Sequence, residues 1–258
     1  MDGILLIDKP AGWTSHDVVA KIRSILRQAA SDKLQVKSGA KKQVLGTLNL
    51  KLETPSPKVK VGHTGTLDPA ATGLMVVVLG SYTKRAAEFS KLDKSYEAEL
   101  TLGKTSTTGD SEGEITESDK LQVTSDKKKP SLDDIQGALK KFTGEIEQTP
   151  PAYSAIKING QRAYKLARKG EKPALEPRKI TIYEISVLDY EYPKLQIKTR
   201  VSSGTYIRSL ADDIGKELAT GAYLSSLCRT QVGQFNLENA LKIDDLSLDA
   251  IQKGLRPA

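Results

Sequence analysis

The chain has 258 residues, of which 38% are hydrophobic, so it is long enough to bury the core of one large domain or of two ordinary ones. Its lysines and arginines number 39 against 32 aspartates and glutamates, and the formal charge of +7 favours a polyanionic partner. A single cysteine excludes an intramolecular disulfide and two histidines leave few ligands for a metal cluster, so we expect a reducing cytosol and no metal.

No stretch of the sequence predicts a membrane span or a secretion signal. The apolar runs at 4–7 and 74–79 are far shorter than the about 20 residues that a bilayer requires. The N-terminus, MDGILLIDKP, begins acidic and has no small-residue cleavage site. We therefore expect a soluble, cytoplasmic protein with no membrane partner.

The first 60 residues predict a strand, a helix and a long irregular segment. Gly3 to Ile7 is typical of a buried strand, and Thr14 or Ser15 can cap a helix whose apolar residues recur at helical spacing. That periodicity is lost at residue 29. Residues 29–60 mix Ser, Gly, Lys and Pro with a short alternating piece at 44–52, which predicts a surface insertion carrying a β-hairpin at most.

A tight loop is predicted from residue 62, followed directly by a buried strand. The loop, GHTGTLDPAATG, covers residues 62–73, and the apolar run 74–79 comes next. Its glycines and small side chains allow the backbone to approach another group closely. Asp68 is the only carboxylate in this loop.

Three interpretations of Asp68 are open from the loop alone. An Asp-Pro pair in a glycine-rich segment is common in turns, where the carboxylate accepts a backbone hydrogen bond. A phosphate-binding loop is disfavoured because the lysine of the GxxxxGK[ST] pattern is missing. The third interpretation is a nucleophilic or acid–base aspartate on a rigid loop.

The rest of the chain predicts strands interspersed with helices. A short helix over 83–89 precedes a half-buried strand over 96–102, which begins with Tyr96 on its inner face. Ser131 can cap a helix that carries apolar residues up to position 142.

Two alternating segments, 180–190 and 195–201, predict a strand pair around a turn at Pro193. A helix with one apolar face begins near Ile207, and 224–234 predicts a last strand. Connections of hairpin length between such elements indicate a mixed α/β (α+β) fold with a largely antiparallel central sheet.

Residues 148–173, QTPPAYSAIKINGQRAYKLARKGEKP, mix tyrosines with lysines and arginines. Basic side chains bind phosphates and aromatic rings stack on bases, so this mixture suits RNA. A solvated amphipathic segment explains the same charge pattern equally well.

Several blocks together resemble the TruB family of tRNA pseudouridine synthases. They occur in the family's order and cover nearly the whole chain outside residues 29–60 and the C-terminal residues: GILLIDKPAGWTSHDVV, VGHTGTLDPAATGLMVVVLG, KSYEAELTLG with TTGDSEG, QTPPAYSAIKINGQRAYKLAR, RVSSGTYIRSLADDIG and GAYLSSLCRTQVGQF. The resemblance implies the pseudouridine synthase fold and the isomerisation of uridine 55 in the TΨC arm of tRNA to pseudouridine, without metal or cofactor.

The resemblance also assigns roles to particular residues. It implies that Asp68 is the nucleophile, that Tyr96 contacts the target base and could remove its C5 proton, and that Arg208 pairs with Asp68. His63, Tyr206 and Leu227 would line the base and RNA site. Residues 148–173 would form a loop that grips the T-arm stem-loop.

The domain organisation implied by the resemblance is a catalytic domain over residues 1–240, with 29–60 as an insertion. The family usually carries a C-terminal RNA-binding domain of PUA type. Because the chain stops soon after Phe235, we expect only a short tail over 241–258 and no PUA domain. We expect the protein to act as a monomer.

The implied chemistry needs a flipped-out uridine and a carboxylate. Flipping costs a few kcal/mol, which stacking on Tyr96 and packing on Leu227 would offset. An aspartate is ionised at neutral pH and could form a covalent adduct or stabilise a cationic sugar, as carboxylates do in glycosidases. Whether it attacks C6, attacks C1′ or promotes elimination is left open.

Other interpretations explain parts of the pattern. Without the blocks, Tyr96 and Tyr206 are typical core aromatics, and Arg208 is typical of a structural ion pair. A non-catalytic RNA-binding protein would use the same basic surface. A nucleosidase or glycoside hydrolase would use Asp68 with a second carboxylate, for which Asp110 is the candidate.

Overall fold

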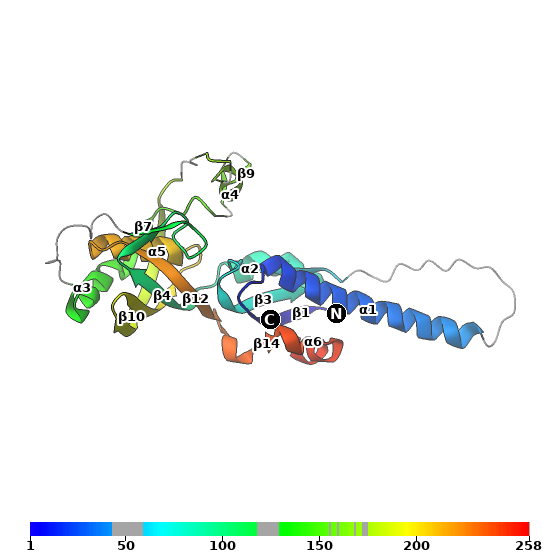
Figure 1. The fold of residues 1–258 in the computed structure, drawn as a ribbon. Helices are drawn as coiled ribbons and strands as arrows, with labels where there is room; N and C mark the ends of the chain where they lie inside the picture. Colours follow the sequence, from blue (N-terminus) through cyan, green and yellow to red (C-terminus); the bar gives the residue numbers. More distant parts are fainter. Residues whose placement is uncertain are drawn as a thin grey trace. The chain divides into compact units, whose positions relative to one another are not determined.

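The computed structural model describes residues 1–42, 59–117, 129–154, 156–158, 160–167, 169–171 and 175–257 (Figure 1). The chain divides into two compact units, the first made of Met1–Ser90 with Phe235–Ala258 and the second of Lys91–Gln234. No helix among the described residues is long and apolar enough to cross a membrane.

The first unit is built on a pair of antiparallel strands. β1 (Gly3–Lys9) pairs with β3 (Thr72–Leu79) along its whole length, and β2 (Val61–His63) pairs with the end of β3. Nearly all residues of β1 and β3 are buried, as expected for strands covered on both faces. The predicted strands at 3–7 and 75–79 are thus confirmed, each slightly longer than expected.

The helix α1 (Ser15–Lys42) is longer than the apolar pattern predicts. Val18, Val19 and Ile22 are buried, and the side chains from 27 to 32 are exposed or half-buried. The prediction that the regular structure ends at residue 29 was wrong. The residues that follow have a high helix propensity, so the helix continues beyond the part whose side chains are buried. Alanine, glutamine and lysine are good helix formers, and Gln28 donates to Asp32 one turn on at 2.9 Å. The alternating piece at 44–52 lies outside the described residues.

The C-terminal residues complete the first unit. β14 (Leu241–Lys242) pairs in parallel with the end of β1, and Ile4 and Arg256 exchange backbone hydrogen bonds of 2.9 Å. Ile251 of α6 (Leu248–Gly254) is fully buried. The remaining elements of this unit are η1 (Gly80–Arg85), α2 (Ala86–Ser90), β13 (Phe235–Asn236), η3 (Leu237–Asn239) and η4 (Ile243–Asp245).

The second unit contains a twisted antiparallel sheet in the order β12-β4-β11-β10-β7. Each of these strands pairs antiparallel with its neighbours: β4 (Lys94–Leu102), β7 (Gly144–Gln148), β10 (Arg178–Glu191), β11 (Lys194–Val201) and β12 (Ala222–Val232). The predicted pair around Pro193 is confirmed as β10 and β11. The mixed α/β fold with a mostly antiparallel sheet is confirmed as well.

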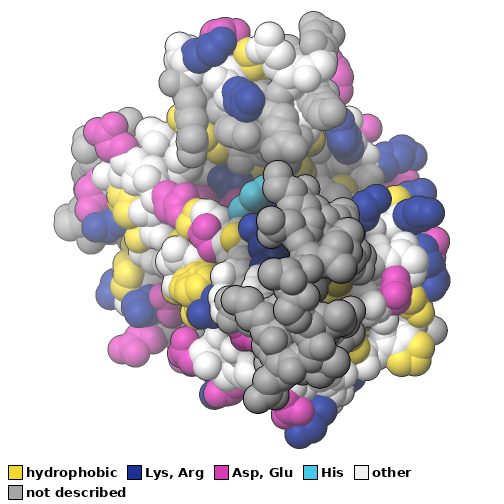
Figure 2. All heavy atoms as spheres, turned by 90° about the vertical axis from the view of Figure 1, so that its right-hand side faces the viewer, with side chains coloured by type: hydrophobic (Ala, Val, Ile, Leu, Met, Phe, Trp, Pro, Cys, Tyr) yellow, Lys and Arg dark blue, Asp and Glu magenta, His cyan; other side chains and the backbone are white. Residues whose placement is uncertain are grey.

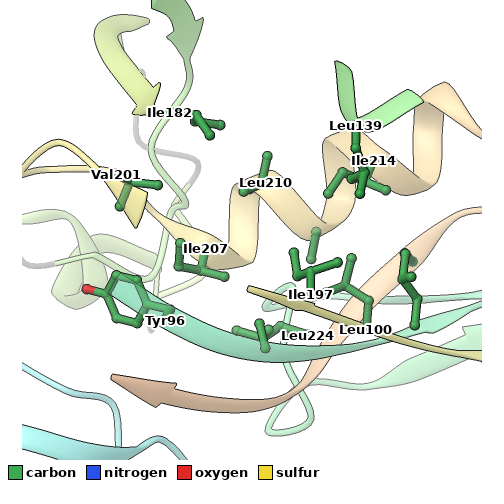
Figure 3. Packing of buried hydrophobic residues seen from close by; sticks show 14 of the residues in the cluster. Tyr96, Leu100, Leu139, Ile182, Ile197, Val201, Ile207, Leu210, Ile214 and Leu224 are labelled. Carbon is green, nitrogen blue, oxygen red and sulfur yellow. The ribbon is translucent and has the colours of Figure 1, made fainter. Parts of the chain in front are cut away.

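One face of this sheet is covered by α5 (Ile207–Glu217) and α3 (Leu132–Phe142) (Figure 3). Ile207, Leu210 and Ile214 of α5 pack onto residues of β4 and β11 such as Leu100 and Ile197. Burying an aliphatic side chain of this size stabilises a fold by about 1.5–3 kcal/mol, so this face supplies the core. Ser131 caps α3 as predicted, by accepting a hydrogen bond from the backbone N–H of Asp134.

Small elements lie at the edges of the second unit, and the sequence pattern did not predict them. β7 is an edge strand in which Ile146 is flanked by Glu145 and Glu147. A single apolar residue between charged ones does not predict a strand. The others are β5 (Lys104–Ser106) with β6 (Ile115–Glu117), and β8 (Lys157–Ile158) with β9 (Gln161–Arg162), followed by α4 (Ala163–Ala167).

Candidate active site

The loop that carries Asp68 is held through its backbone on both sides of that residue. The hydroxyl group of Ser15 accepts a hydrogen bond from the N–H of Leu67 at 2.9 Å and donates to the Leu67 carbonyl at 3.0 Å. On the other side, the N–H of Gly12 donates to the Pro69 carbonyl at 2.9 Å. Asp68 is half-buried between these fixed neighbours, so the loop presents its carboxylate from a rigid backbone.

A buried lysine joins the Asp68 loop to the loop after β1. Lys9 has no solvent-exposed surface, and its Nζ donates to the carbonyl of Pro10 at 2.9 Å, of Trp13 at 2.7 Å and of Pro69 at 3.1 Å. An ammonium group has three N–H donors, so these carbonyls match its full capacity. Lys9 therefore acts as a clamp between the two loops of the first unit.

His63, at the end of β2, is the second residue of the segment 62–73 and is half-buried. Its ring meets that of His16, the other histidine of the chain, edge to face at a centroid distance of 6.3 Å. Next to it, Thr64 donates from both its N–H and its hydroxyl group to the carbonyl of Val76 on β3. The backbone next to His63 is thus fixed by hydrogen bonds to β3.

Tyr96 lies on the inner face of β4, as predicted, and is 8% exposed. In Figure 3 its ring is at one end of the buried cluster beside Ile207, with its hydroxyl oxygen pointing away from the other labelled side chains. Leu227, opposite Ala98 on the neighbouring strand, packs against the same cluster. The buried cluster therefore supports the ring of Tyr96, and the hydroxyl group of Tyr96 points away from that cluster.

Arg208 is a buried cation whose side-chain nitrogens contact two different segments of the second unit, the turn at 108–110 and Tyr153. Nη1 lies 3.1 Å from a carboxylate oxygen of Asp110 and donates to the Thr108 carbonyl at 3.3 Å, and Nη2 donates to the Tyr153 carbonyl at 2.8 Å. Both members of the Arg208–Asp110 pair are about nine-tenths buried. Such a pair costs much desolvation, and removing one member leaves an uncompensated buried charge.

The turn that carries Asp110 is shaped to receive Arg208. The carboxylate of Asp110 also accepts from the Thr108 hydroxyl group and from the N–H of Glu112 at 3.1 Å. Gly109 adopts φ +77°, and a Cβ there would come within 3.6 Å of the Cβ of Arg208. The left-handed backbone favours glycine at this position, and the distance to Arg208 is an ordinary van der Waals contact.

Lys94 and Arg229 place two positive charges in the buried part of the sheet. Lys94 is 8% exposed and Arg229 is 2% exposed, and Arg229 lies opposite Tyr96 in the β12–β4 register. Burial, and to a smaller extent the charge of Arg229, lowers the pKa of Lys94 to about 8, while Asp93 acts against the shift. Tyr96 thus shares β4 with one buried basic residue and lies opposite another on β12.

A polar cavity of about 410 Å³ lies beside the start of α5. Its walls come from the turn at 106–109, from the segment 147–153 and from α5, including Arg208, Asp212 and Asp213. Burial raises the pKa of Asp213 above its ordinary value. No group of three or more His, Cys, Asp or Glu side chains suited to a metal ion occurs among the residues with described positions.

The residues assigned from the sequence fall into two sets. The second unit brings Tyr96 and Leu227 into one cluster with Ile207, the residue between Tyr206 and Arg208. Asp68 and His63 belong to the first unit. The predicted pairing of Asp68 with Arg208 joins residues of different units and stays a prediction, as do the individual roles; the partner of Arg208 within its own unit is Asp110.

The sequence pattern singles out neither Lys9 nor Gln148, and it indicates Ser15 only as a possible helix cap. Each acts through backbone groups of residues more than 50 positions away. A buried lysine or glutamine of this kind looks like an ordinary polar residue in the sequence. The sequence indicates Asp110 only as a candidate second carboxylate.

Solved structures share this fold. A crystal structure of a Cbf5–Nop10–Gar1 complex matches with a TM-score of 0.66 and 28% identity, over 99% of this chain and 60% of that one. A structure of an H/ACA RNP bound to a substrate RNA containing 2′-deoxyuridine matches with a TM-score of 0.63 and 26% identity, over 99% and 59%. The chain spans about 60% of the length of these structural relatives.

Family models and curated relatives agree with the fold. Residues 51–207 match the TruB family pseudouridylate synthase N-terminal domain, and residues 208–254 match the tRNA pseudouridylate synthase B C-terminal domain. Relatives named tRNA pseudouridine synthase B include those of Dehalococcoides mccartyi, 44% identical over 95% of this chain and 70% of the relative, and Clostridium kluyveri, 40% identical over 100% and 76%. The chain belongs to the TruB family of pseudouridylate synthases and is an isomerase.

Proposed function

We propose that this protein converts uridine 55 in the T-arm of tRNA to pseudouridine, with Asp68 as the nucleophile. The observation that carries the proposal is the Asp68 loop, which lies inside the matched TruB segment and is held by its backbone on both sides. In this reaction the N1–C1′ bond breaks, the base turns, C5 bonds to C1′, the C5 proton leaves and N1 takes up a proton. No atoms are gained or lost overall.

The roles of the chain's own groups follow from their chemistry. The Asp68 carboxylate would bond to C6 or C1′ as a nucleophile, or stabilise the positive charge that develops on the sugar as the N1–C1′ bond weakens. Tyr96, supported by the core below its ring, would stack on the flipped base and receive the C5 proton. Arg208 would add positive charge that keeps a carboxylate ionised and oriented.

The geometry of Asp110 bears on the competing hydrolase function. A glycoside hydrolase needs a second carboxyl group that donates a proton to the leaving group. Asp110 faces donors: Arg208, the Thr108 hydroxyl group and the Glu112 N–H. A carboxylate used as an acceptor in this way is poorly placed as a general acid, which favours the isomerase.

The decisive measurement is tritium release from a T-arm stem-loop transcript labelled at C5 of uridine. We expect the wild-type protein to release the label from one uridine without added metal or cofactor. Asp68→Asn should lower turnover at least about 10³-fold and leave RNA affinity within about threefold, because the carboxylate acts in the reaction rather than in binding.

The matched control for this variant is Asp244→Asn, an exposed carboxylate in η4 of the same unit. It should retain wild-type turnover. Full activity of Asp68→Asn would remove Asp68 from the mechanism, and release of label from several unrelated uridines would remove the T-arm specificity.

The T-arm contact is assigned to residues 148–173, whose backbone forms the β8–β9 hairpin and α4. In Figure 2 lysine and arginine side chains are spread over the visible face with acidic ones among them, so this face shows no single large basic patch. Neutralising Lys157 and Arg162 should weaken RNA binding and reduce the salt slope by about 2.

Filter binding between 50 and 300 mM salt checks this contact. Over this range of salt concentration, each phosphate contact changes the RNA affinity by about several-fold. The control exchanges two exposed lysines outside the segment, Lys140 and Lys198, for glutamine. An unchanged salt slope in the Lys157 and Arg162 variant would contradict phosphate contacts there. We also propose that the protein acts as a monomer in the cytoplasm, which sedimentation and cell fractionation would check.

A further inference from the structure

The side-chain amide of Gln148 binds the backbone of Tyr206 at both of its polar atoms. Its Nε2 donates to the Tyr206 carbonyl at 3.1 Å, and its Oε1 accepts from the Tyr206 N–H at 2.8 Å. Gln148 is 2% exposed. An N–H can only donate and a carbonyl can only accept, so the partners themselves determine which way the amide faces.

Tyr206 is the N-cap residue of α5, and it is an unusual one. Ser, Thr, Asp and Asn are preferred at this position because their side chains bind the first helical N–H groups. Tyr206 makes no such side-chain cap. The position of the helix start therefore depends on what binds its backbone, and Gln148 comes from the end of β7, where it pairs with Arg178 of β10.

Further contacts link the residues just after Gln148 to the same turn of α5. The hydroxyl group of Ser209 donates to the Thr149 carbonyl at 3.0 Å, and Nη2 of Arg208 donates to the Tyr153 carbonyl at 2.8 Å. The first residues of the segment 148–173 and the first turn of α5 are thus tied together. Movement of one requires movement of the other.

We propose that Gln148 is a positioning residue for the isomerisation: it holds the backbone of Tyr206, and with it the start of α5, so that Tyr206 and Arg208 keep the geometry that turnover requires. The inference rests on the proposed function, because it assigns Gln148 a part in that reaction. Gln148 itself contacts no reacting atom in this role. It also couples the RNA-gripping segment to the helix that carries Arg208.

The chemistry of the clamp distinguishes glutamine from its closest substitutes. Methionine has a similar length but offers neither a donor nor an acceptor. In Gln148→Met the two hydrogen bonds from this side chain to the N–H and the carbonyl of Tyr206 are therefore lost. Glutamate has the same shape, yet when ionised it can only accept. When protonated, glutamate regains a donor and can reproduce both hydrogen bonds, and burial favours that neutral form.

The experiment measures single-turnover rate and RNA affinity for wild type, Gln148→Met and Gln148→Glu on the T-arm transcript at pH 6 and pH 8.5. We expect both variants at pH 8.5 to lose at least about tenfold in rate with affinity within about threefold, because positioning acts on the reacting complex. At pH 6 the rate of Gln148→Glu relative to wild type should rise about tenfold, and that of Gln148→Met should not.

Gln136→Glu, the same exchange at an exposed position of α3, is the control and should follow wild type at both pH values. Wild-type rates in both Gln148 variants would overturn the inference. So would a loss in Gln148→Glu that is the same at pH 6 and pH 8.5.

A second measurement does not depend on turnover. Hydrogen exchange of the Tyr206 amide should be at least about tenfold faster in Gln148→Met than in wild type, because the amide loses its acceptor. Unchanged exchange would overturn the inference even if the protein isomerises uridine. If the wild-type protein left the transcript unmodified, the proposed function would fail, and exchange would still decide whether Gln148 holds the helix start.

Discussion

The contacts that fix two proposed catalytic residues differ between the units. The loop of Asp68 is held through the backbone of its neighbours: Ser15 binds Leu67, and Lys9 with Gly12 binds Pro69. Arg208 is held through its own side chain, whose nitrogens face Asp110 and two carbonyls. For the proposed roles, a fixed loop backbone orients the Asp68 carboxylate toward a substrate, and a fixed guanidinium keeps its charge in one place.

The largest expected effect comes from breaking the side-chain arrangement. Arg208→Met leaves Asp110 buried without its cation, so we expect the free energy of unfolding to fall by about 3–5 kcal/mol and turnover to be lost. Urea unfolding and tritium release would measure the two effects.

The double variant Arg208→Met with Asp110→Asn tests the cause of that instability. It removes the uncompensated charge and should recover at least about 1 kcal/mol of stability without recovering turnover. Equal stability of the single and double variants would mean that the Asp110 charge is not what destabilises the protein.

Breaking the backbone arrangement should have a smaller effect on stability. Lys9→Met removes the ammonium group from the carbonyls of Pro10, Trp13 and Pro69 in a fully buried place. We expect a loss of about 2–4 kcal/mol in urea unfolding and faster hydrogen exchange over residues 66–71. The exposed Lys21→Met on α1 is the control, and matching results for the two lysines would contradict the clamp.

The smallest effect concerns the buried lysine of the second unit, Lys94. Because burial lowers its pKa to about 8 from 10.5, the unfolded chain binds more protons than the folded one between these values, and stability should rise with pH across that window. Lys94→Met should remove this rise and be more stable than wild type below pH 8, by about 1–2 kcal/mol after allowance for solvent screening. Urea unfolding from pH 7 to 10 measures the slope; equal slopes would disprove the assignment.

Much of the fold could be predicted because many elements carry a local pattern. Strands with alternating or continuous apolar residues, such as β3, β10 and β11, appear where expected, and the capped helix α3 begins where Ser131 predicts. The elements that escaped prediction have weak patterns. β7 is a short edge strand between charged residues, and the outer part of α1 is helical through propensity alone.

The sequence alone determined the isomerase family, the Asp68 loop and the predicted list of site residues, because these depend on blocks whose residues are adjacent along the chain. Tertiary structure alone decided that Arg208 pairs with Asp110, that Lys9 clamps the Asp68 loop and that Gln148 holds the start of α5. These partners lie some 60 to 100 residues apart along the chain. A donor many positions from its acceptor carries no local signal, since its partner is chosen only when packing brings the two segments together and excludes water from both.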